Sequence, residues 1–326
     1  MNADLLVEGA LDLHAHASPE FTRSMPGRVS NVEWARLASR SRMRGFVVKS
    51  HVFPTCAMTN VLAELFPELE IFSSITLNPP AGGLSPLAVE LAIAAGAKVV
   101  WMPTWSARHE SVHHSIVLER MQAHLSTLDS QYWPRHGLTA VDDRGQLLQH
   151  VDDILGICAR AGVTVASGHL PISQSMLLCE RMVELGGSFV LTHPLSSSVD
   201  ASIDHQRSIA AAGGWIEHVF VGCMPMHQRM DPRLIVEAIE AVGAEHCILA
   251  TDAIETWNPP EPELLRMFIA TLLNLGIPDD QVQLMTHDNP AAALGLDGSI
   301  APERAPASSL IGTETIRTVD QSLAAS

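Results

Sequence analysis

The chain has 326 residues, a length that allows one large α/β unit or two smaller ones. Apolar residues make up 47% of it and charged residues only 17%, which excludes a disordered chain and indicates a well-buried core. The formal net charge of −16 argues against a nucleic acid or an anionic membrane surface as a partner.

Short apolar segments recur along the whole chain and predict eight strands, with helical patterns between them. Ser30 and Glu33 open the first of these helices with the spacing of a capping box. The predicted strands cover residues 9–17, 45–51, 71–78, 98–104, 163–170, 188–195, 215–220 and 247–253. The predicted helices cover residues 31–42, 86–95, 147–161, 174–185, 204–212 and 232–242.

The regular alternation of strands and helices predicts the fold class. Alternation implies a parallel sheet, and eight such units imply a closed (β/α)8 TIM barrel of the α/β class. A doubly wound open sheet is the alternative. It would normally carry a glycine-rich phosphate loop after an early strand, and residues 18–23 (SPEFTR) do not resemble one. We therefore expect a single barrel over residues 1–297.

Two regions depart from the length of a strand–helix unit. Residues 105–146 form a long insertion after the fourth strand, rich in His and Arg, and an Asp-Arg-Gly turn near its end predicts a small hairpin. In a barrel this insertion leaves the carboxyl-terminal face, where it could act as a lid. Residues 298–326 are rich in Ala, Pro, Ser and Thr, and we expect an extended or disordered tail.

Polar side chains stand at the same end of five predicted strands. Side chains two apart on a strand share a face, so the His-x-His pattern of the first strand places two imidazoles side by side. The carboxyl ends of barrel strands are where catalytic groups lie. The residues at these ends are His14 and His16, Lys49 and His51, His169, His193, and Asp252.

Each of these residues also has a structural explanation. A lone histidine such as His193 is more often a hydrogen-bonded core or loop residue, Asp252 could cap a helix, and Lys49 could pair with a carboxylate at the rim. These explanations are independent and would have to coincide at one end of one barrel. A metal site explains the convergence more simply, since nitrogen and oxygen ligands suit Zn²⁺, Mn²⁺ or Fe²⁺.

The pattern as a whole resembles the amidohydrolase superfamily. The shared features are His-x-His on strand one, a histidine on each of strands five and six, and an aspartate on strand eight, so the match spans nearly the whole chain. Residues 286–296 are similar to the final helix of that superfamily. The segments LDLHAH, VVKSH and GHLP are similar to a little-characterised branch of it, which implies a chemistry but no substrate.

The resemblance implies a role for each matching residue. His14, His16 and Asp252 would hold one metal ion, while His169 and His193 would hold a second ion or contact the substrate. Asp252 would also take a proton from the activated water and pass it to the leaving group. We expect zinc, with Mn or Fe as alternatives, at one or two ions per chain.

Lys49 stands where the chain departs from the commonest two-metal pattern of the superfamily. That pattern has a carboxylated lysine or a glutamate on strand four, and residues 99–104 (VVWMPT) contain neither. Lys49 on strand two is the obvious substitute, because burial near cations favours a neutral amine that can form a carbamate. The alternatives are a one-metal site in which Lys49 stabilises an oxyanion, or a lysine that binds a substrate carboxylate.

Further candidates lie close to these positions. His51 shares a face with Lys49 and is a candidate ligand, general acid or substrate contact; it joins Asp252 and His193 in the predicted catalytic set. Arg23 and Arg108 leave strand-end loops and are expected to hold an anionic group of the substrate. One residue of the pair Glu217 and His218 on strand seven points inward, although a salt bridge at the rim explains that pair equally well.

These observations predict a metal-dependent hydrolase that acts on an amide, a cyclic amide or an ester of a small molecule. A decarboxylase or phosphoesterase on the same barrel is one alternative, and a metal-binding sensor barrel without chemistry is another. We expect a cytoplasmic protein, because the amino terminus has no basic, apolar signal region and the five cysteines are scattered without CxxC spacing. No run is long enough to cross a bilayer, and a homo-oligomer is left open.

Overall fold

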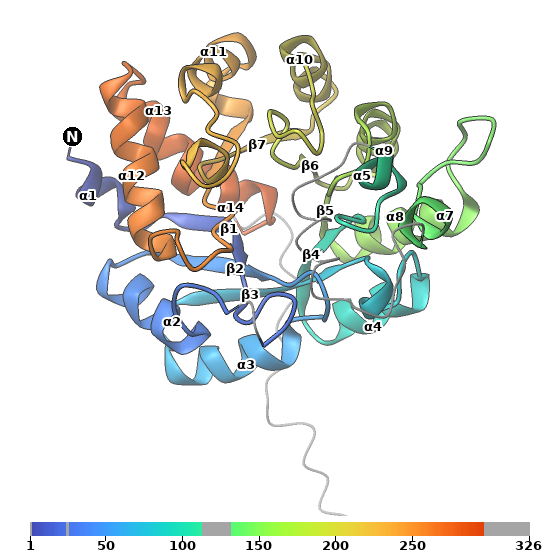
Figure 1. Ribbon diagram of the computed structural model, residues 1–326, viewed down its shortest axis with the longest axis horizontal. Coiled ribbons are helices and arrows are strands. Elements are labelled where there is room, and N and C mark those ends of the chain that lie inside the picture. The colour runs from blue at the N-terminus through green and yellow to red at the C-terminus, as the bar shows by residue number, and fades with distance from the viewer. Residues whose placement is uncertain (1, 24–25, 113–131, 297–326) are drawn as a thin grey trace, which may run out of the picture.

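The computed structural model describes residues 2–23, 26–112 and 132–296. In these residues eight parallel strands form one sheet in sequential order, from β1 to β8. A parallel bridge between Ala15 and Ala253 joins the first strand to the segment that follows the last, so the sheet curls into a nearly closed barrel (Figure 1). The predicted (β/α)8 fold is confirmed.

Every predicted strand is present, but each ends earlier than the apolar pattern suggested. As a result His51, His169, His193 and Asp252 follow their strands instead of lying within them, because the backbone leaves the parallel ladder as it turns into each loop. The strands are β1 (Leu11–His16), β2 (Gly45–Lys49), β3 (Glu70–Thr76), β4 (Ala97–Trp101), β5 (Thr164–Ala166), β6 (Phe189–Leu191), β7 (Trp215–Val219) and β8 (Cys247–Ala250).

The longer helices lie around the outside of the barrel (Figure 1). Ser30 caps the first of them as its spacing predicted, since its hydroxyl accepts a hydrogen bond from the backbone N–H of Glu33. These helices are α2 (Asn31–Arg40), α3 (Cys56–Leu65), α4 (Pro86–Ala94), α8 (Gln149–Ala161), α9 (Ile172–Glu184), α10 (Ile203–Ala211), α11 (Arg233–Val242) and α12 (Glu261–Asn274).

Two of these helices, α3 and α12, were not predicted from the sequence. No side chain caps either helix at its amino terminus, although α12 has a proline and two acidic residues in its first turn. Short helical segments complete the described chain: α1 (Ala3–Val7), α5 (Arg108–Val112), α7 (Tyr132–His136), α13 (Asp279–Gln283), a π-helical turn η4 (Leu284–Asp288), α14 (Asn289–Ala293), and 3-10 turns η1 (Pro79–Ala81), η2 (Val221–Cys223) and η3 (Ala244–His246).

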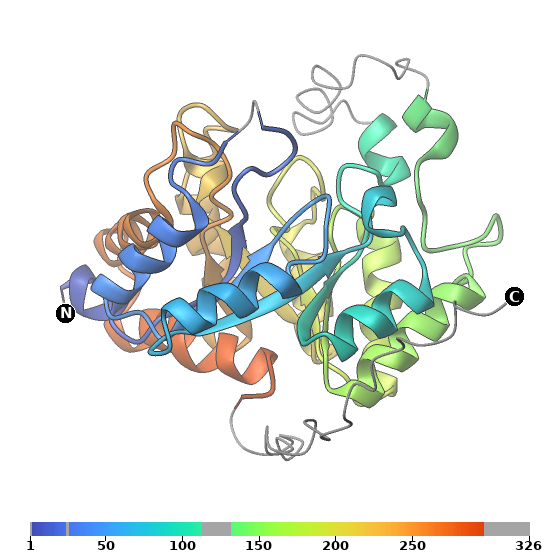
Figure 2. The same cartoon turned by 90° about the horizontal axis from the view of Figure 1, so that it is seen from below.

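Helix α14 covers the amino-terminal end of the barrel. The hydroxyl of Thr164, at the start of β5, donates a 2.6 Å hydrogen bond to the carbonyl of Ala293. Ala291 and Leu294 pack with Trp101 in the apolar cluster inside the barrel. The opposite, carboxyl-terminal end therefore remains for a ligand, and α5 and α7 stand at that end (Figure 2).

The insertion is described at both of its ends. An antiparallel bridge between Val141 and Leu147 confirms the predicted hairpin. Residues 113–131 of the insertion and the predicted tail at 298–326 lie outside the described residues, so the lid and the tail stay predictions. Across the described residues, no helix is long and apolar enough to cross a membrane.

Candidate metal centre

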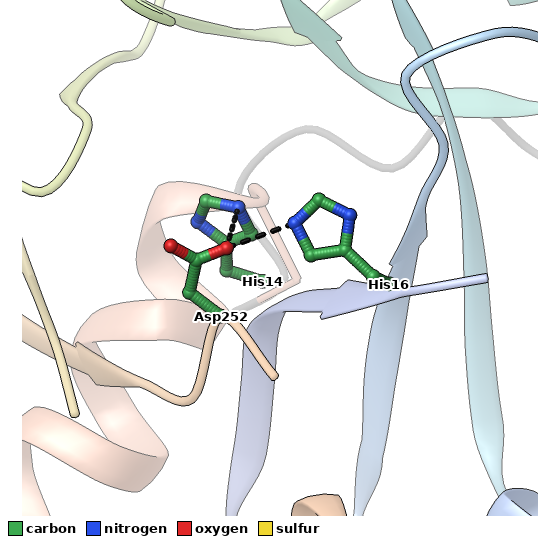
Figure 3. A group of neighbouring side chains, drawn as sticks. All are labelled: His14, His16 and Asp252. Carbon is green, nitrogen blue, oxygen red and sulfur yellow. Dashed lines mark hydrogen bonds and ion pairs between the residues drawn. The ribbon is translucent and has the colours of Figure 1, made fainter. Parts of the chain in front are cut away.

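His14, His16 and Asp252 meet where the barrel closes. Strand β1 directs both imidazoles to one face, as the two-residue spacing predicted. The Nε2 of His16 lies 2.8 Å from Oδ1 of Asp252, and the Nε2 of His14 lies 3.1 Å from the same oxygen (Figure 3). One ligand atom from each residue lies within 4.8 Å of the others, so the three could hold a metal ion.

The backbone around Asp252 holds its carboxylate against β1. The backbone N–H of Asp252 donates a 2.8 Å hydrogen bond to the carbonyl of His14. Asp252 has a φ of 52°, in the left-handed region that a residue with a Cβ seldom adopts. Such strain persists only where surrounding contacts impose it, and it is common at functional sites.

Below these ligands, Asp12 ties the first strand to the last. One of its oxygens accepts hydrogen bonds from the backbone N–H groups of His14 and Thr251, at 3.0 and 3.2 Å. The other oxygen accepts a bond from the Thr251 hydroxyl at 2.5 Å. Burial raises the pKa of Asp12 to about 6. Asp12 thus fixes the backbone of His14 and the position of Thr251, the residue before Asp252.

Lys49 lies beside the same centre. Its side chain is fully buried, and Nζ lies 2.8 Å from the Nε2 of His14 and 4.4 Å from the centre of the Trp101 ring. Burial lowers the pKa of Lys49, although Asp252 and Glu217 oppose that shift. Lys49, from β2, therefore reaches the centre past the indole ring of Trp101, the last residue of β4. The commonest two-metal pattern has a lysine or a glutamate on strand four, and this chain has Trp101 at the end of that strand.

His169 and His193 form a second pair of imidazoles. Their Nε2 atoms lie 3.2 Å apart. Gly168 sets the position of the first, because its φ is +59° and a Cβ there would lie 2.3 Å from the carbonyl oxygen of Met102. His193 has a φ of 27°. Like Asp252, it follows a strand and has a strained backbone.

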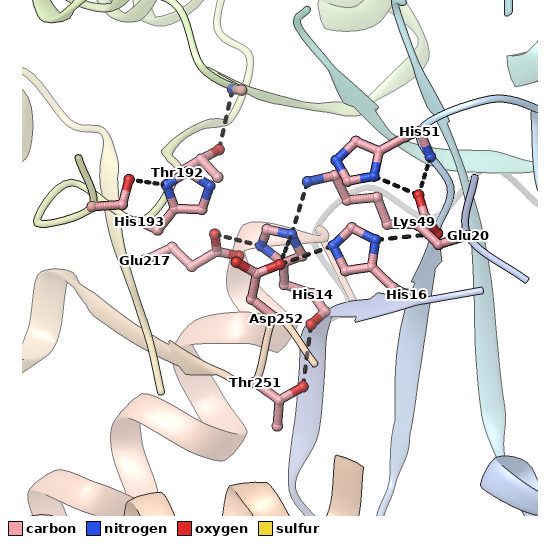
Figure 4. A network of polar contacts seen from close by, with 12 residues as sticks. His14, His16, Glu20, Lys49, His51, Thr192, His193, Glu217, Thr251 and Asp252 are labelled. Carbon is pink, nitrogen blue, oxygen red and sulfur yellow. Dashed lines mark hydrogen bonds and ion pairs between the residues drawn. The ribbon is translucent and has the colours of Figure 1, made fainter. Parts of the chain in front are cut away.

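A side-chain oxygen stands behind the Nδ1 atom of five histidines in the site: His14, His16, His51, His169 and His193. These oxygens leave each Nε2 facing the centre, and partners of this kind orient the ligands of metal sites and fix their tautomers. The contacts are Glu217 with His14 at 3.0 Å, Glu20 with His16 at 3.3 Å and with His51 at 2.5 Å, Glu110 with His169 at 2.7 Å, and Ser196 with His193 at 2.7 Å (Figure 4 shows those of Glu217 and Glu20).

Glu20 serves two of these histidines at once. It is buried in the loop after β1, and besides its contacts with both rings it accepts a hydrogen bond from the backbone N–H of His51 (Figure 4). His16, Glu20 and His51 also form a group that could hold a cation. An imidazole that already offers Nε2 beside Asp252 would have to lose its second proton to bind there too, so Glu20 is better explained as a partner of the two rings.

The charges of the site favour a cation at its centre. Burial alone would lower the pKa of His16, but Glu20 and Asp252 raise it to about 9. Burial alone would raise the pKa of Asp252, but His14 and His16 hold it well below its usual range. Two imidazoles and an ionised carboxylate are a donor set suited to Zn²⁺, Mn²⁺ or Fe²⁺, and a divalent ion would take the place of the His16 proton. The residues present therefore fit a divalent metal.

A cavity opens from this centre to the carboxyl-terminal face of the barrel. Polar side chains that include Lys49, His51 and His193 line its floor, and Phe21, Val219 and Ile254 line its walls. The ring of Phe21 stacks on His51 with 4.8 Å between centroids and 10° between planes. The cavity thus combines reactive groups with an apolar wall, as small-molecule sites do.

The remaining candidates are Arg23, Arg108, Glu217 and His218. Arg23 and Arg108 are exposed and are not among the residues that line the cavity. Glu217 is the inward member of its pair, whereas His218 faces the helices, near Ile235. Burial lowers the pKa of His218 to about 4, which favours the neutral imidazole.

Three residues that contact these histidines were not predicted from the sequence: Glu20, Glu110 and Ser196. Only Glu20 left a usable signal, as a carboxylate four residues after His16 in the loop that leaves the same strand. Glu110 lies in the insertion and Ser196 in the loop after β6, where no periodic pattern predicts the direction of a side chain.

Several solved structures share the fold of this barrel. The probable dipeptidase PvdM from Pseudomonas aeruginosa is 13% identical, with a TM-score of 0.60 over 90% of this chain and 96% of that one. An amidohydrolase from the same organism is 13% identical, with a TM-score of 0.56 over 90% and 98%. The 2,6-dihydroxybenzoate decarboxylase from Rhizobium is 11% identical, with a TM-score of 0.53 over 89% and 100%.

These likenesses show that the three proteins share the (β/α)8 fold of this chain. The chain belongs to the family described as family of unknown function (DUF6282), whose model matches residues 9–217. A search of curated proteins found no match.

Proposed function

We propose that this protein is a metal-dependent hydrolase that uses water to cleave an amide, a cyclic amide or an ester of a small molecule. The convergence of His14, His16 and Asp252 at the open end of the barrel is the observation that carries the proposal. The carboxylates behind the two histidines support it, because a histidine that binds a metal typically has a buried carboxylate that orients its ring.

The same three residues would hold a first divalent ion, with zinc the expected metal and Mn or Fe as alternatives. His169 and His193 would hold a second ion or contact the substrate. When bound, such an ion lowers the pKa of water and polarises a carbonyl group, which is the chemistry that hydrolysis needs. A cytoplasmic location and a small-molecule substrate belong to the same proposal.

Asp252 would move the proton during the reaction. Its Oδ1 faces His14 and His16, and its side chain also lines the cavity. The carboxylate can accept a proton from the attacking water and deliver it to the leaving group. His51 and His193 line the same cavity and would bind or protonate the substrate there.

Lys49 has two competing roles in this proposal. A neutral Lys49 amine can add carbon dioxide, losing one proton, to give a carbamate that would bridge two ions. A charged Lys49 would instead stabilise developing negative charge on the substrate. Burial of Nζ favours the first role, and the position over the Trp101 ring favours the second.

Elemental analysis and a substrate panel test the proposal together. Protein purified without chelator should contain a divalent metal, and it should turn over at least one member of a panel of amides, cyclic amides and esters. The variant Asp252→Asn should keep most of its metal and lose turnover by about 10²-fold or more, as expected for a lost proton-transfer group. Near-wild-type turnover in that variant would overturn the mechanism.

Two further groups of compounds, added to this panel, separate the alternatives. Aryl carboxylates test decarboxylation, an activity that the name of the Rhizobium structure gives for that protein, and phosphoesters test phosphoester hydrolysis. Bound metal without turnover on any of these compounds would favour a binding or sensor barrel.

A further inference from the structure

The insertion after β4 sends one carboxylate into the site. Helix α5 begins at Arg108, which is exposed, and two residues later Glu110 is fully buried. The Oε1 of Glu110 lies 2.7 Å from the Nδ1 of His169. An insertion that only covered the surface would not need a buried acidic side chain in contact with a histidine of the barrel.

The backbone at both ends of the insertion holds α5 in this place. Ser106 and Leu138 come from opposite ends, and the N–H of Leu138 donates a 2.7 Å hydrogen bond to the carbonyl of Ser106. The N–H of Arg108 donates a bond of the same length back to the carbonyl of Leu138. These paired bonds fix the direction in which α5 leaves the barrel.

Asn78, after β3, anchors the segment between β4 and α5. Its Oδ1 accepts hydrogen bonds from the backbone N–H of Thr104 at 3.0 Å and from the Ser106 hydroxyl at 2.7 Å. Its Nδ2 donates a 2.8 Å bond to the Thr104 hydroxyl. All three side chains are fully buried, so the position of Glu110 rests on a connected polar network.

The chemistry of the contact decides which nitrogen of His169 carries the proton. A buried carboxylate is costly unless its charge is compensated. The contact is not aligned for a hydrogen bond, but at 2.7 Å a lone pair on Nδ1 would repel the carboxylate oxygen and a proton there would attract it. A proton on Nδ1 leaves the lone pair of Nε2 directed toward the Nε2 of His193, 3.2 Å away. That lone pair can accept a hydrogen bond from His193 or from a substrate, or it can bind a cation.

We propose that Glu110 is a positioning residue that fixes the Nδ1–H tautomer of His169, so that the insertion is a structural part of the active site. The ligand that His169 binds through Nε2 depends on the proposed function, whereas the tautomer of His169 does not. A failure of either idea is therefore visible separately.

Long-range ¹H–¹⁵N spectra of the histidine side chains test the proposal, with the His169 signals assigned from a His169→Asn variant. In the wild-type chain the proton should be on Nδ1 of His169. Glu110→Met, which removes the acceptor at similar volume, should shift His169 toward the Nε2–H tautomer. Glu110→Gln keeps a weaker acceptor, so the Nδ1 proton should remain and move upfield.

Zinc titration gives an independent readout. Either variant should weaken zinc binding or substrate binding at His169 by about 10- to 100-fold, the usual effect of losing such a partner. Asp143→Asn, at an exposed position on the hairpin of the same insertion, is the matched control and should change neither measurement.

Unchanged His169 signals in a folded Glu110→Met variant would overturn the proposal. If that variant does not fold, the Glu110→Gln spectrum decides. An Nδ1 proton at its wild-type position in that spectrum would overturn the proposal equally. Neither outcome depends on whether a substrate has been found.

Discussion

The Nε2 of His16 lies 2.8 Å from the Oδ1 of Asp252, although 236 residues separate the two along the chain. The contact exists because β1 and the segment after β8 lie side by side where the barrel closes, at the bridge between Ala15 and Ala253. A cation held by these side chains would join the first strand to the last. Metal binding and folding are therefore expected to be linked.

Removal of metal should lower the stability of the protein. A ligand that binds only the folded state stabilises it by about 2.7 kcal/mol when its concentration is 100 times its Kd. Thermal unfolding should move to lower temperature after treatment with a chelator and recover when zinc is added back. The measurement is a thermal melt followed by circular dichroism.

A histidine variant shows whether the effect belongs to this site. His16→Asn should melt at the same temperature with and without chelator, because the site has lost a ligand. His150→Asn, at an exposed position on α8, should respond to chelator like the wild-type chain. A chelator response that survives in His16→Asn would place the metal elsewhere.

The sequence pattern predicted the barrel, and it predicted that two histidines lie side by side, because both depend on periodicity. Alternating strands and helices specify the sheet, and a spacing of two on a strand specifies that His14 and His16 share a face. His169, His193 and Asp252 were found because equivalent ends of parallel strands meet at one face of the barrel. Those inferences needed only the order of the elements.

The residues behind the candidate ligands could not be predicted, because they do not follow the periodicity of a strand or a helix. Glu20 and Glu110 lie in loops, where side-chain direction follows from tertiary contacts such as those of Asn78 with Thr104. His51 was placed on strand two beside Lys49, but the strand ends at Lys49, and contacts with Glu20 and Phe21 hold His51 instead. Loop geometry of this kind leaves no repeating pattern in the sequence.

The state of Lys49 is expected to determine how many metal ions the site can hold. Because burial lowers its pKa, we expect a carbamate and two ions per chain in protein kept in bicarbonate. Lys49→Arg cannot form a carbamate, and it should hold one ion and lose turnover by about 10²-fold. Elemental analysis of both proteins is the measurement. One ion per wild-type chain would assign Lys49 to charge stabilisation instead.

Glu20 should matter to both metal and substrate, because it contacts His16 and His51 together. Glu20→Gln should weaken metal binding by about tenfold, the lower range for loss of a partner to a ligand. It should also raise KM, since His51 lines the cavity and would no longer be held. Zinc titration and steady-state kinetics on an identified substrate measure the two effects.

The control for this experiment is Glu64→Gln, at an exposed position on α3, which should leave both values unchanged. A change in metal affinity with an unchanged KM would mean that Glu20 serves His16 alone. Unchanged values for both would show that the buried contacts of Glu20 do not position the site.

Glu261 should make the metal-free protein less stable as the pH rises. It lies at the start of α12 near His16, and its Oε2 has no hydrogen-bond partner within the described ranges. Burial raises its pKa from 4.5 to about 8. A carboxyl with a raised pKa in the folded state favours folding fully at low pH, and that advantage is lost as the pH climbs from 4.5 to about 8.

Glu261→Gln removes this titration and keeps the shape of the side chain. Urea unfolding of chelator-treated protein should show similar stabilities for the variant and the wild-type chain near pH 4.5, where the unfolded carboxyl is half protonated. At pH 7 the variant should be more stable by about 3 kcal/mol, since each pKa unit corresponds to about 1.4 kcal/mol. Glu263→Gln, two residues along the same helix, loses an exposed pair with Arg266 and should change stability by less than about 1 kcal/mol. Parallel pH profiles for Glu261→Gln and the wild-type chain would show that Glu261 ionises in the folded protein as freely as in the unfolded chain.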